Sequence, residues 1–444
     1  MTAPVAGAPP VATPPPLLFA LLKLAGPVAL ARLGVIAMGV TDVVMVGQLA
    51  PAELPAQALG WSPVGVLLLA GIGLLTGVQV LSGLAYGSRR PEEAGIVLRR
   101  GLWLAGVAGA LAGIAVALLA EPLLLAFGIA PELARAAAPV AQVLGLSIPL
   151  QLAFSAGSYF LEGVQRPNAT TLVMWLANLI NIGLNWALIP EHGAVGSAWA
   201  TVGSRLFLVV ALLAWIAWMP GREAFRPFAR STIPGPGFGD LLRIGGAAAL
   251  SQAAEAGAFS GMTVIAGRIS AEAVAAYQVL LNAMAVVFML ALGFAAASAV
   301  LVAEARGQGD RSRARKAGLA GVLCNSVVML ACAGVMLVFA GPIAGAFTAD
   351  PNIVALAVAA IPFAAVALTP DGAQAVLSQT LRAHGDNWFP TASHVLAYVF
   401  VMPPLGWWLG EHLGKGVSGL LEAIFWASVL SAAVLGWRLM RLSR

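Results

Sequence analysis

Long apolar segments recur along the whole chain, and they constrain its fold more than any other feature. A helix of about 20 apolar residues is long enough to cross a lipid bilayer. Only 10% of the residues are charged, against about 25% in soluble domains, so water-soluble classes are excluded. The chain is therefore predicted to be an all-α membrane protein with twelve transmembrane helices. These are expected at approximately residues 17–47, 57–86, 97–120, 134–160, 168–190, 196–218, 240–267, 276–303, 317–342, 353–380, 389–409 and 416–437.

The basic residues indicate how these segments cross the membrane. When both termini are placed in the cytoplasm, nineteen of the 24 lysines and arginines fall on the cytoplasmic side. Three fall outside, and the remaining two, Arg32 and Arg205, lie deep inside segments. This asymmetry follows the positive-inside rule, which a wrong number of segments would violate. We therefore expect a multi-pass protein of the cell (inner) membrane with both termini cytoplasmic. The net charge of +5 is a topology signal, and no nucleic-acid partner is expected.

A repeat with a constant offset of 220 residues divides the chain into two similar halves. The run Leu21–Gly26 recurs as Leu241–Gly246, and the loop glycine Gly87 matches Gly307. We predict a disordered, Pro/Ala-rich tail (1–16), an N-lobe with six spans (17–219), a basic linker rich in proline and glycine (220–239), and a C-lobe with six spans (240–444). Because six is even, both lobes enter the membrane in the same sense, as in transporters built from parallel repeats.

Four carboxylates lie well inside apolar segments, at Asp42, Glu255, Asp371 and Glu422. An ionisable group within the membrane is costly and is a functional-site hypothesis by default. The repeat does not duplicate them, since the residues at the equivalent positions are uncharged (Met262, Val35, Gln151 and Val202). This asymmetry favours a function for the first three. Glu422 lies closer to a membrane face and is expected to be paired or hydrated.

The expected partners of Asp42 come from the fifth and sixth segments and are all neutral. Asn181 and Asn185 are four residues apart and therefore share one helix face, and Thr201 lies in the next segment. One carboxylate with amide and hydroxyl oxygens suits a monovalent cation such as Na⁺, and it would equally serve a carboxylate that takes up a proton. The alternative is a hydrogen-bonded cluster that only joins helices.

The C-lobe acids occur in a different setting. Glu255 is surrounded by alanine and glycine, which allow close helix packing but also leave room for a cavity. Asp371 follows Pro370, a broken-helix pattern that often lines binding cavities. Both are predicted to bind a cation, a proton or a cationic drug, with structural pairing as the alternative. Arg32 and Arg205 are expected to have structural roles, either reaching the interface or pairing with a carboxylate.

No catalytic or nucleotide-binding motif occurs in the sequence. It contains no Walker A loop, and its two cysteines, eight residues apart in one apolar segment, do not form a metal-ligand pattern. We therefore expect no enzyme activity, no cofactor other than Na⁺ or H⁺ as coupling ion, and transport energised by an ion gradient. A lipid-modifying membrane enzyme would need clustered polar residues, whereas the four histidines are scattered. A channel or receptor remains an alternative.

Several loops together resemble those of one family. Gly47 follows Asp42, and the loops read YGSRRPEEAG (86–95), ARGQGDRSRARKAG (305–318) and LRAHGDNWFP (381–390). From Leu17 to about Leu442 the chain resembles the multidrug and toxic compound extrusion (MATE) transporters, in particular their NorM-like branch. The resemblance implies two pseudo-symmetric six-helix lobes around a V-shaped cavity. It also implies export of cationic or amphiphilic small molecules in exchange for Na⁺ or H⁺, by a protein expected to be a monomer among membrane lipids.

The family's functional positions can be carried over to this sequence. Its N-lobe cation site falls on Asp42, Asn181, Asn185 and Thr201, and the C-lobe acids of the NorM-like branch fall on Glu255 and Asp371. Pro27 matches a proline at which the first helix bends in some members. Asn185 stands where many members have an aspartate, and Ala367 stands where that branch often has a tyrosine. The alternative within the superfamily, a lipid-linked oligosaccharide flippase, predicts a strongly cationic cavity.

Overall fold

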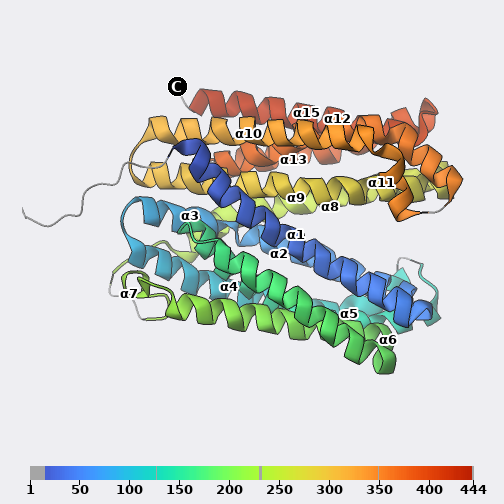
Figure 1. Ribbon diagram of the computed structural model, residues 1–444, viewed down its shortest axis with the longest axis horizontal. Helices are drawn as coiled ribbons and strands as arrows, with labels where there is room; N and C mark the ends of the chain where they lie inside the picture. Colours follow the sequence, from blue (N-terminus) through green and yellow to red (C-terminus); the bar gives the residue numbers. More distant parts are fainter. Residues whose placement is uncertain (1–15, 127, 230–232, 349, 443–444) are drawn as a thin grey trace, which may run out of the picture.

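The computed structural model describes residues 16–126, 128–229, 233–348 and 350–442, so most of the predicted tail lies outside the described residues. Within these ranges all regular elements are helices (Figure 1). The α-helices are α1 (Leu17–Leu49), α2 (Leu54–Leu74), α3 (Thr76–Gly87), α4 (Pro91–Ala126), α5 (Pro131–Gly163), α6 (Asn168–Trp218), α7 (Arg222–Phe225), α8 (Phe238–Ile269), α9 (Ala271–Gly307), α10 (Arg311–Val338), α11 (Ala340–Phe347), α12 (Pro351–Ala383), α13 (Trp388–His394), α14 (Met402–Trp407) and α15 (Gly416–Leu442).

Ten helical stretches among the described residues are long and apolar enough to cross a membrane. One of them, α6, is 51 residues long and contains non-helical backbone at Gly193. The chain reverses there and divides α6 into two limbs. The limbs lie side by side, since a side chain at Gly203 in the second limb would meet Leu184 in the first. Helix α8 is also long enough, at 32 residues, but its many small residues with Gln252 and Glu255 lower its hydropathy. With the second limb of α6 and with α8, each of the twelve predicted spans has a helical counterpart.

The helices form two lobes, as Figure 1 shows, with α8–α15 as one layer and α2–α6 as the other. Each lobe has its own apolar core. The first halves of α1 and α8 cross between the lobes. Leu21 of α1 packs with Val300 of α9 in the C-lobe, whereas its repeat mate Leu241 of α8 packs in the N-lobe core. The lobes are thus joined by a reciprocal exchange of helix ends.

Equivalent hydrogen bonds confirm that the two lobes are pseudo-symmetric. The Thr171 hydroxyl donates to the carbonyl oxygen of Pro27 at 2.7 Å. The Thr391 hydroxyl donates to the carbonyl oxygen of Ala247 at 2.6 Å. Both partners differ by the 220-residue offset found in the sequence. Helix α1 continues through Pro27, and the predicted bend at this residue stays a prediction.

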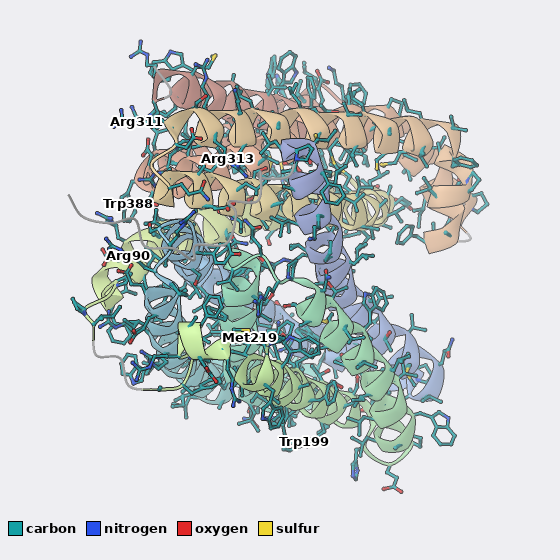
Figure 2. The ribbon with its side chains drawn as sticks, turned by 60° about the vertical axis from the view of Figure 1, so that its left-hand side comes forward. Arg90, Trp199, Met219, Arg311, Arg313 and Trp388 are labelled. Carbon is teal, nitrogen blue, oxygen red and sulfur yellow. The ribbon has the colours of Figure 1, made fainter. Side chains whose placement is uncertain are left out.

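The lobes touch closely at one end of the molecule, here named the basic end because Arg90, Arg311 and Arg313 lie there (Figure 2). Gly87 and Gly307, which are repeat mates, allow this contact. A side chain at either glycine would overlap backbone of the opposite lobe. Away from the basic end the layers diverge, as Figure 1 shows, which gives the molecule its V shape.

Candidate functional site

Asp42 lies at the centre of a buried polar cluster in the N-lobe. Its side chain is fully inaccessible to solvent. The amides of Asn181 and Asn185 donate to its Oδ1 at 3.0 and 2.7 Å, and the Thr201 hydroxyl donates to its Oδ2 at 2.6 Å. The structure therefore brings together all four residues that the sequence suggested for this lobe.

The hairpin within α6 explains how distant residues reach one carboxylate. Asn181 and Asn185 lie on its first limb and Thr201 lies on its second. Gly193, with φ +56° and ψ −135°, forms the reversal in a conformation that favours glycine. The Glu53 carboxylate accepts a hydrogen bond of 2.7 Å from the Ala194 amide and so caps the second limb. The turn thus sets the height of Thr201 beside Asp42.

The cluster has the ligand chemistry of a small hard cation. It offers carboxylate, hydroxyl and amide oxygens, which suit Na⁺ better than a transition metal. The Asn185 Oδ1 is buried and has no hydrogen-bond partner among the described residues, so an oxygen is free to coordinate. The residues present therefore fit Na⁺ or a proton.

Arg205 corrects the expectation that Asp42 has only neutral partners. Its side chain is 5% exposed, and it interacts electrostatically with Asp42. Its Nη1 donates to the Ser147 hydroxyl at 2.7 Å. The guanidinium carbon lies 5.3 Å from the centre of the Trp61 ring, a cation–π contact. A structural role or a carboxylate partner was expected for Arg205, and the structure places this cation beside the candidate site.

The C-lobe acids also lie in one polar cluster. Asp371 is 6% exposed, and its Oδ1 accepts hydrogen bonds from Gln374 at 3.3 Å, Tyr398 at 3.1 Å and Ser428 at 3.2 Å. Glu255 on α8 is partly buried and lies close enough to Asp371 for the two charges to interact. Arg382, which is only 3% exposed, also interacts electrostatically with Glu255, so this cluster holds two interacting carboxylates and one buried arginine.

Tyr398 was not found by sequence reasoning. It supplies a phenol to Asp371 from the π-helical segment Val395–Val401, although the position one turn before this acid is Ala367. Only four tyrosines occur in the chain, and this one lies inside an apolar segment. A polar aromatic residue in a predicted span was therefore the signal that could have identified it.

Glu162 is a second residue that the sequence did not single out. It lies just beyond the predicted end of its span, yet it is only 2% exposed. Arg32 forms an ion pair with it at 3.5 Å, and Gln79 and Ser158 donate hydrogen bonds to it at 2.5 and 2.9 Å. Its charge is thus matched within the lobe, which agrees with the structural role expected for Arg32. Glu422, similarly, is paired with Lys415 at 2.7 Å, as expected.

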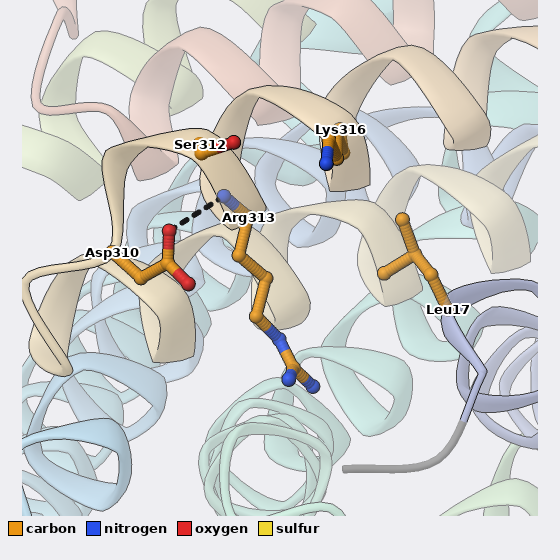
Figure 3. Close-up of a pocket in the computed structure, with 5 residues that line it drawn as sticks. All are labelled: Leu17, Asp310, Ser312, Arg313 and Lys316. Atoms are coloured by element: carbon orange, nitrogen blue, oxygen red, sulfur yellow. Dashed lines mark hydrogen bonds between the residues drawn. The ribbon is translucent and has the colours of Figure 1, made fainter.

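A cavity of about 560 Å³ adjoins the N-lobe cluster. Asp42, Thr201, Arg205 and Gln151 line it together with largely apolar side chains, and Asn282 of α9 contributes from the other lobe. A smaller cavity of about 240 Å³ lies at the basic end, lined by Leu17, Asp310, Ser312, Arg313 and Lys316 (Figure 3). There Asp310 caps α10 by accepting a hydrogen bond of 2.8 Å from the Arg313 amide. The larger cavity adjoins the buried Asp42 cluster and is therefore the candidate substrate site.

Comparisons with known proteins agree with this architecture. The sequence model of the MatE family matches residues 27–187 and 247–408, two regions that start 220 residues apart. A probable multidrug resistance protein NorM from Caulobacter vibrioides is 39% identical over 96% of this chain and 91% of its own length. An outward-facing multidrug resistance MATE family transporter of the MOP superfamily has a TM-score of 0.88 at 22% identity, covering 96% of each chain. The eukaryotic MATE transporter AtDTX14 has a TM-score of 0.87 at 19% identity, covering 96% of this chain and 98% of its own.

Proposed function

Because the chain belongs to the MatE family, we propose that it is a secondary active efflux antiporter. It exports cationic or amphiphilic small molecules in exchange for Na⁺ or H⁺. One observation carries this proposal: each lobe of the V-shaped bundle contains a buried acidic cluster, and one of them adjoins a largely apolar cavity. The name of the Caulobacter relative, a probable multidrug resistance protein, agrees with a broad range of substrates.

In the N-lobe, Asp42 is the proposed coupling residue. Asn181, Asn185 and Thr201 hold its carboxylate by three hydrogen bonds and would supply further oxygen ligands to Na⁺ after reorienting. Protonation of Asp42 would remove its charge and therefore release a bound cation. Binding or release of Na⁺ or a proton at Asp42 would change the charge between α1 and α6. These two helices pack together beside the cavity.

In the C-lobe, Glu255 and Asp371 are the proposed residues for the cation, the proton or the cationic drug. Their like charges repel each other, and binding of a proton or a cation at either acid would relieve the repulsion that Arg382 beside Glu255 does not offset. Tyr398 and Ser428 position the Asp371 carboxylate. Alternating access would follow from rocking of the lobes about their contact at the basic end.

The proposed setting is the cell (inner) membrane, with the basic end and both termini in the cytoplasm. In that orientation the lobes are closed toward the cytoplasm, where Gln165 of the N-lobe donates to Glu304 of the C-lobe at 2.6 Å. The V opens outward. The protein is proposed to act as a monomer in contact with membrane lipids.

The experiment is transport of a fluorescent cation in proteoliposomes, with a Na⁺ gradient or a pH gradient imposed separately. An antiporter accumulates the dye against its gradient only when one of the two ion gradients is present. The variants D42N, E255Q and D371N should lose this accumulation, and E422Q, whose acid is paired with Lys415, is the matched control. Dye movement that ignores both gradients would contradict coupled exchange.

The rival flippase predicts a strongly cationic cavity. Among the described residues that line the cavity, the charged side chains are Asp42 and Arg205, one of each sign. This balance favours a substrate other than a polyanionic lipid. Reconstitution with a labelled anionic glycolipid tests the alternative, since a flippase would move it between leaflets.

A further inference from the structure

Arg382 is a buried cation in the C-lobe whose charge is not balanced by the groups that hold it. It lies on α12 and is only 3% exposed. Its guanidinium donates hydrogen bonds to the hydroxyls of Ser378 and, at 3.5 Å, Thr391. Because hydroxyls carry no charge, a buried arginine held in this way requires an acid nearby. Its electrostatic partner is Glu255.

One face of α8 brings Glu255 toward this part of the lobe. Ala247, Ser251 and Glu255 follow one another at intervals of four residues and therefore share a helix face. The carbonyl oxygen of Ala247 accepts a hydrogen bond of 2.6 Å from Thr391. The Ser251 hydroxyl shares a hydrogen bond of 2.7 Å with Nδ1 of His394. Two polar contacts between α8 and α13 thus fix the helix face on which Glu255 follows one turn later.

The N-lobe contains an equivalent ion pair in which the two charges are exchanged. Glu162, the repeat mate of Arg382, is 2% exposed and pairs with Arg32 of α1 at 3.5 Å. The repeat mate of Arg32 is Gln252 of α8. Glu255 follows three residues later and lies on the same side of that helix. In both lobes, therefore, a charge on the first helix interacts with the opposite charge on the fourth span, α5 or α12.

This exchange gives the interiors of the two lobes different net charges. In the N-lobe the two buried acids are balanced by two arginines, so its interior is neutral. In the C-lobe cluster, Glu255 and Asp371 interact with each other, and Arg382 supplies one positive charge. His394 is counted as a neutral imidazole, since a second cation beside Arg382 would be repelled. Among the described residues, the C-lobe cluster therefore carries one unbalanced negative charge.

We propose that Arg382 is the permanent counter-ion of the Glu255–Asp371 pair and thereby limits the C-lobe to one monovalent cation or one proton per transport cycle. This inference rests on the proposed efflux function and sets how much charge its C-lobe site takes up. Without the arginine, two acids would need two positive charges. With it, one bound Na⁺ or one proton leaves the cluster neutral, which is the least costly state inside a membrane.

The test restores the net charge of the cluster without restoring the acid. E255Q leaves Asp371 balanced by Arg382, so the neutral cluster no longer attracts a cation. E255Q/R382Q returns the net charge to minus one. Accumulation of a fluorescent cation in proteoliposomes, driven by a Na⁺ or a pH gradient, should fall at least about tenfold in E255Q and recover to within about threefold of the wild type in E255Q/R382Q. The matched control E255Q/R438Q removes an arginine that pairs with Asp386 and should not recover.

Thermal unfolding in detergent tests the pairing without any transport. R382Q leaves two like charges unbalanced in the cluster, and E255Q removes one of them. The loss of melting temperature in E255Q/R382Q should therefore be smaller than the sum of the losses in the two single variants. If R382Q alone does not fold whereas E255Q/R382Q does, the same pairing is seen in its strongest form. Gel filtration is the check that E255Q/R382Q is folded in the transport assay.

Three results would overturn the inference. Additive losses of melting temperature would mean that Glu255 and Arg382 do not balance each other. Accumulation in E255Q as high as in the wild type would mean that the net charge of the cluster does not limit binding. Accumulation as low in folded E255Q/R382Q as in E255Q would make Glu255 an indispensable ligand rather than one of two acids that share a counter-ion.

Failure of the proposed function is seen separately. If the melting losses are not additive but the wild type accumulates the dye on neither gradient, the charge pairing of Arg382 stands and the antiporter assignment fails.

Discussion

The charge relation between Asp42 and Arg205 predicts a specific pattern of stability changes. The substitution D42N keeps the shape of the side chain and an oxygen that accepts from Asn181 and Asn185. It removes the charge that balances a guanidinium only 5% exposed. Breaking a buried ion pair by removing one partner typically costs about 3–5 kcal/mol, because the other charge is left uncompensated.

Asp42 and Arg205 interact electrostatically without forming a direct ion pair, and Trp61 still contacts the guanidinium. The expected cost is therefore below that range, about 2 kcal/mol. R205Q leaves Asp42 with its three hydrogen-bond donors and should cost less, about 1–2 kcal/mol. The double variant D42N/R205Q removes both charges. Its cost should therefore be smaller than the sum of the single costs by about 1–3 kcal/mol.

The measurement is thermal unfolding of the four proteins in the same detergent at pH 7.5, followed by tryptophan fluorescence. The pair D42N/E422Q is the control, because Glu422 pairs with Lys415 and should add independently. Additive shifts for D42N and R205Q would refute the argument that the two charges compensate each other within the N-lobe.

Three further predictions concern other parts of the molecule. Y398F removes one of the donors to Asp371 and should cost about 1 kcal/mol in stability while weakening ion-driven efflux; unchanged coupling would contradict a positioning role for this phenol. G193A places a side chain against the Glu53 carboxylate at a position with positive φ. We expect the free energy of unfolding to fall by about 2 kcal/mol, measured as a lower melting temperature. G26A is the control, because a side chain at Gly26 would meet open space. Burial and the nearby charge of Arg306 lower the pKa of His384 to about 4. As the pH falls, the unfolded chain therefore takes up a proton near pH 6.5, before the folded protein does. The stability of the folded protein should fall between pH 6.5 and 4, and H384Q should show a flatter dependence of stability on pH.

The fold could be predicted from the sequence because membrane spans are specified locally. Each helix in lipid must satisfy its own backbone hydrogen bonds, so an apolar run of sufficient length is itself evidence of a span. The offset between Gly87 and Gly307 likewise indicated the repeat. The exchange of helix ends could not be predicted, since Leu21 and Leu241 are equally apolar whichever lobe they contact.

The candidate sites were predictable to different extents. Asn181 and Asn185 share a helix face by their spacing, so their approach to Asp42 could be anticipated. The position of Arg205 relative to Asp42 depends on where the α6 hairpin turns. The sequence pattern does not specify the residue at which this turn occurs. Tyr398 reaches Asp371 from another helix through a π-helical turn, whereas the family pattern indicates only the position one turn before the acid, which is Ala367 here.

The proposed coupling is an exchange in which carboxylates in the two lobes link substrate export to an inward flow of cations. Its most direct test is substrate-driven ion movement in proteoliposomes, with internal Na⁺ or pH reported by a trapped indicator and no ion gradient imposed at the start. We expect a gradient of exported substrate to drive Na⁺ or H⁺ in the opposite direction in the wild type and in E422Q. We expect D42N or D371N to abolish this movement. Substrate flux without any movement of Na⁺ or H⁺, or equal ion movement in D42N, D371N and the wild type, would contradict it.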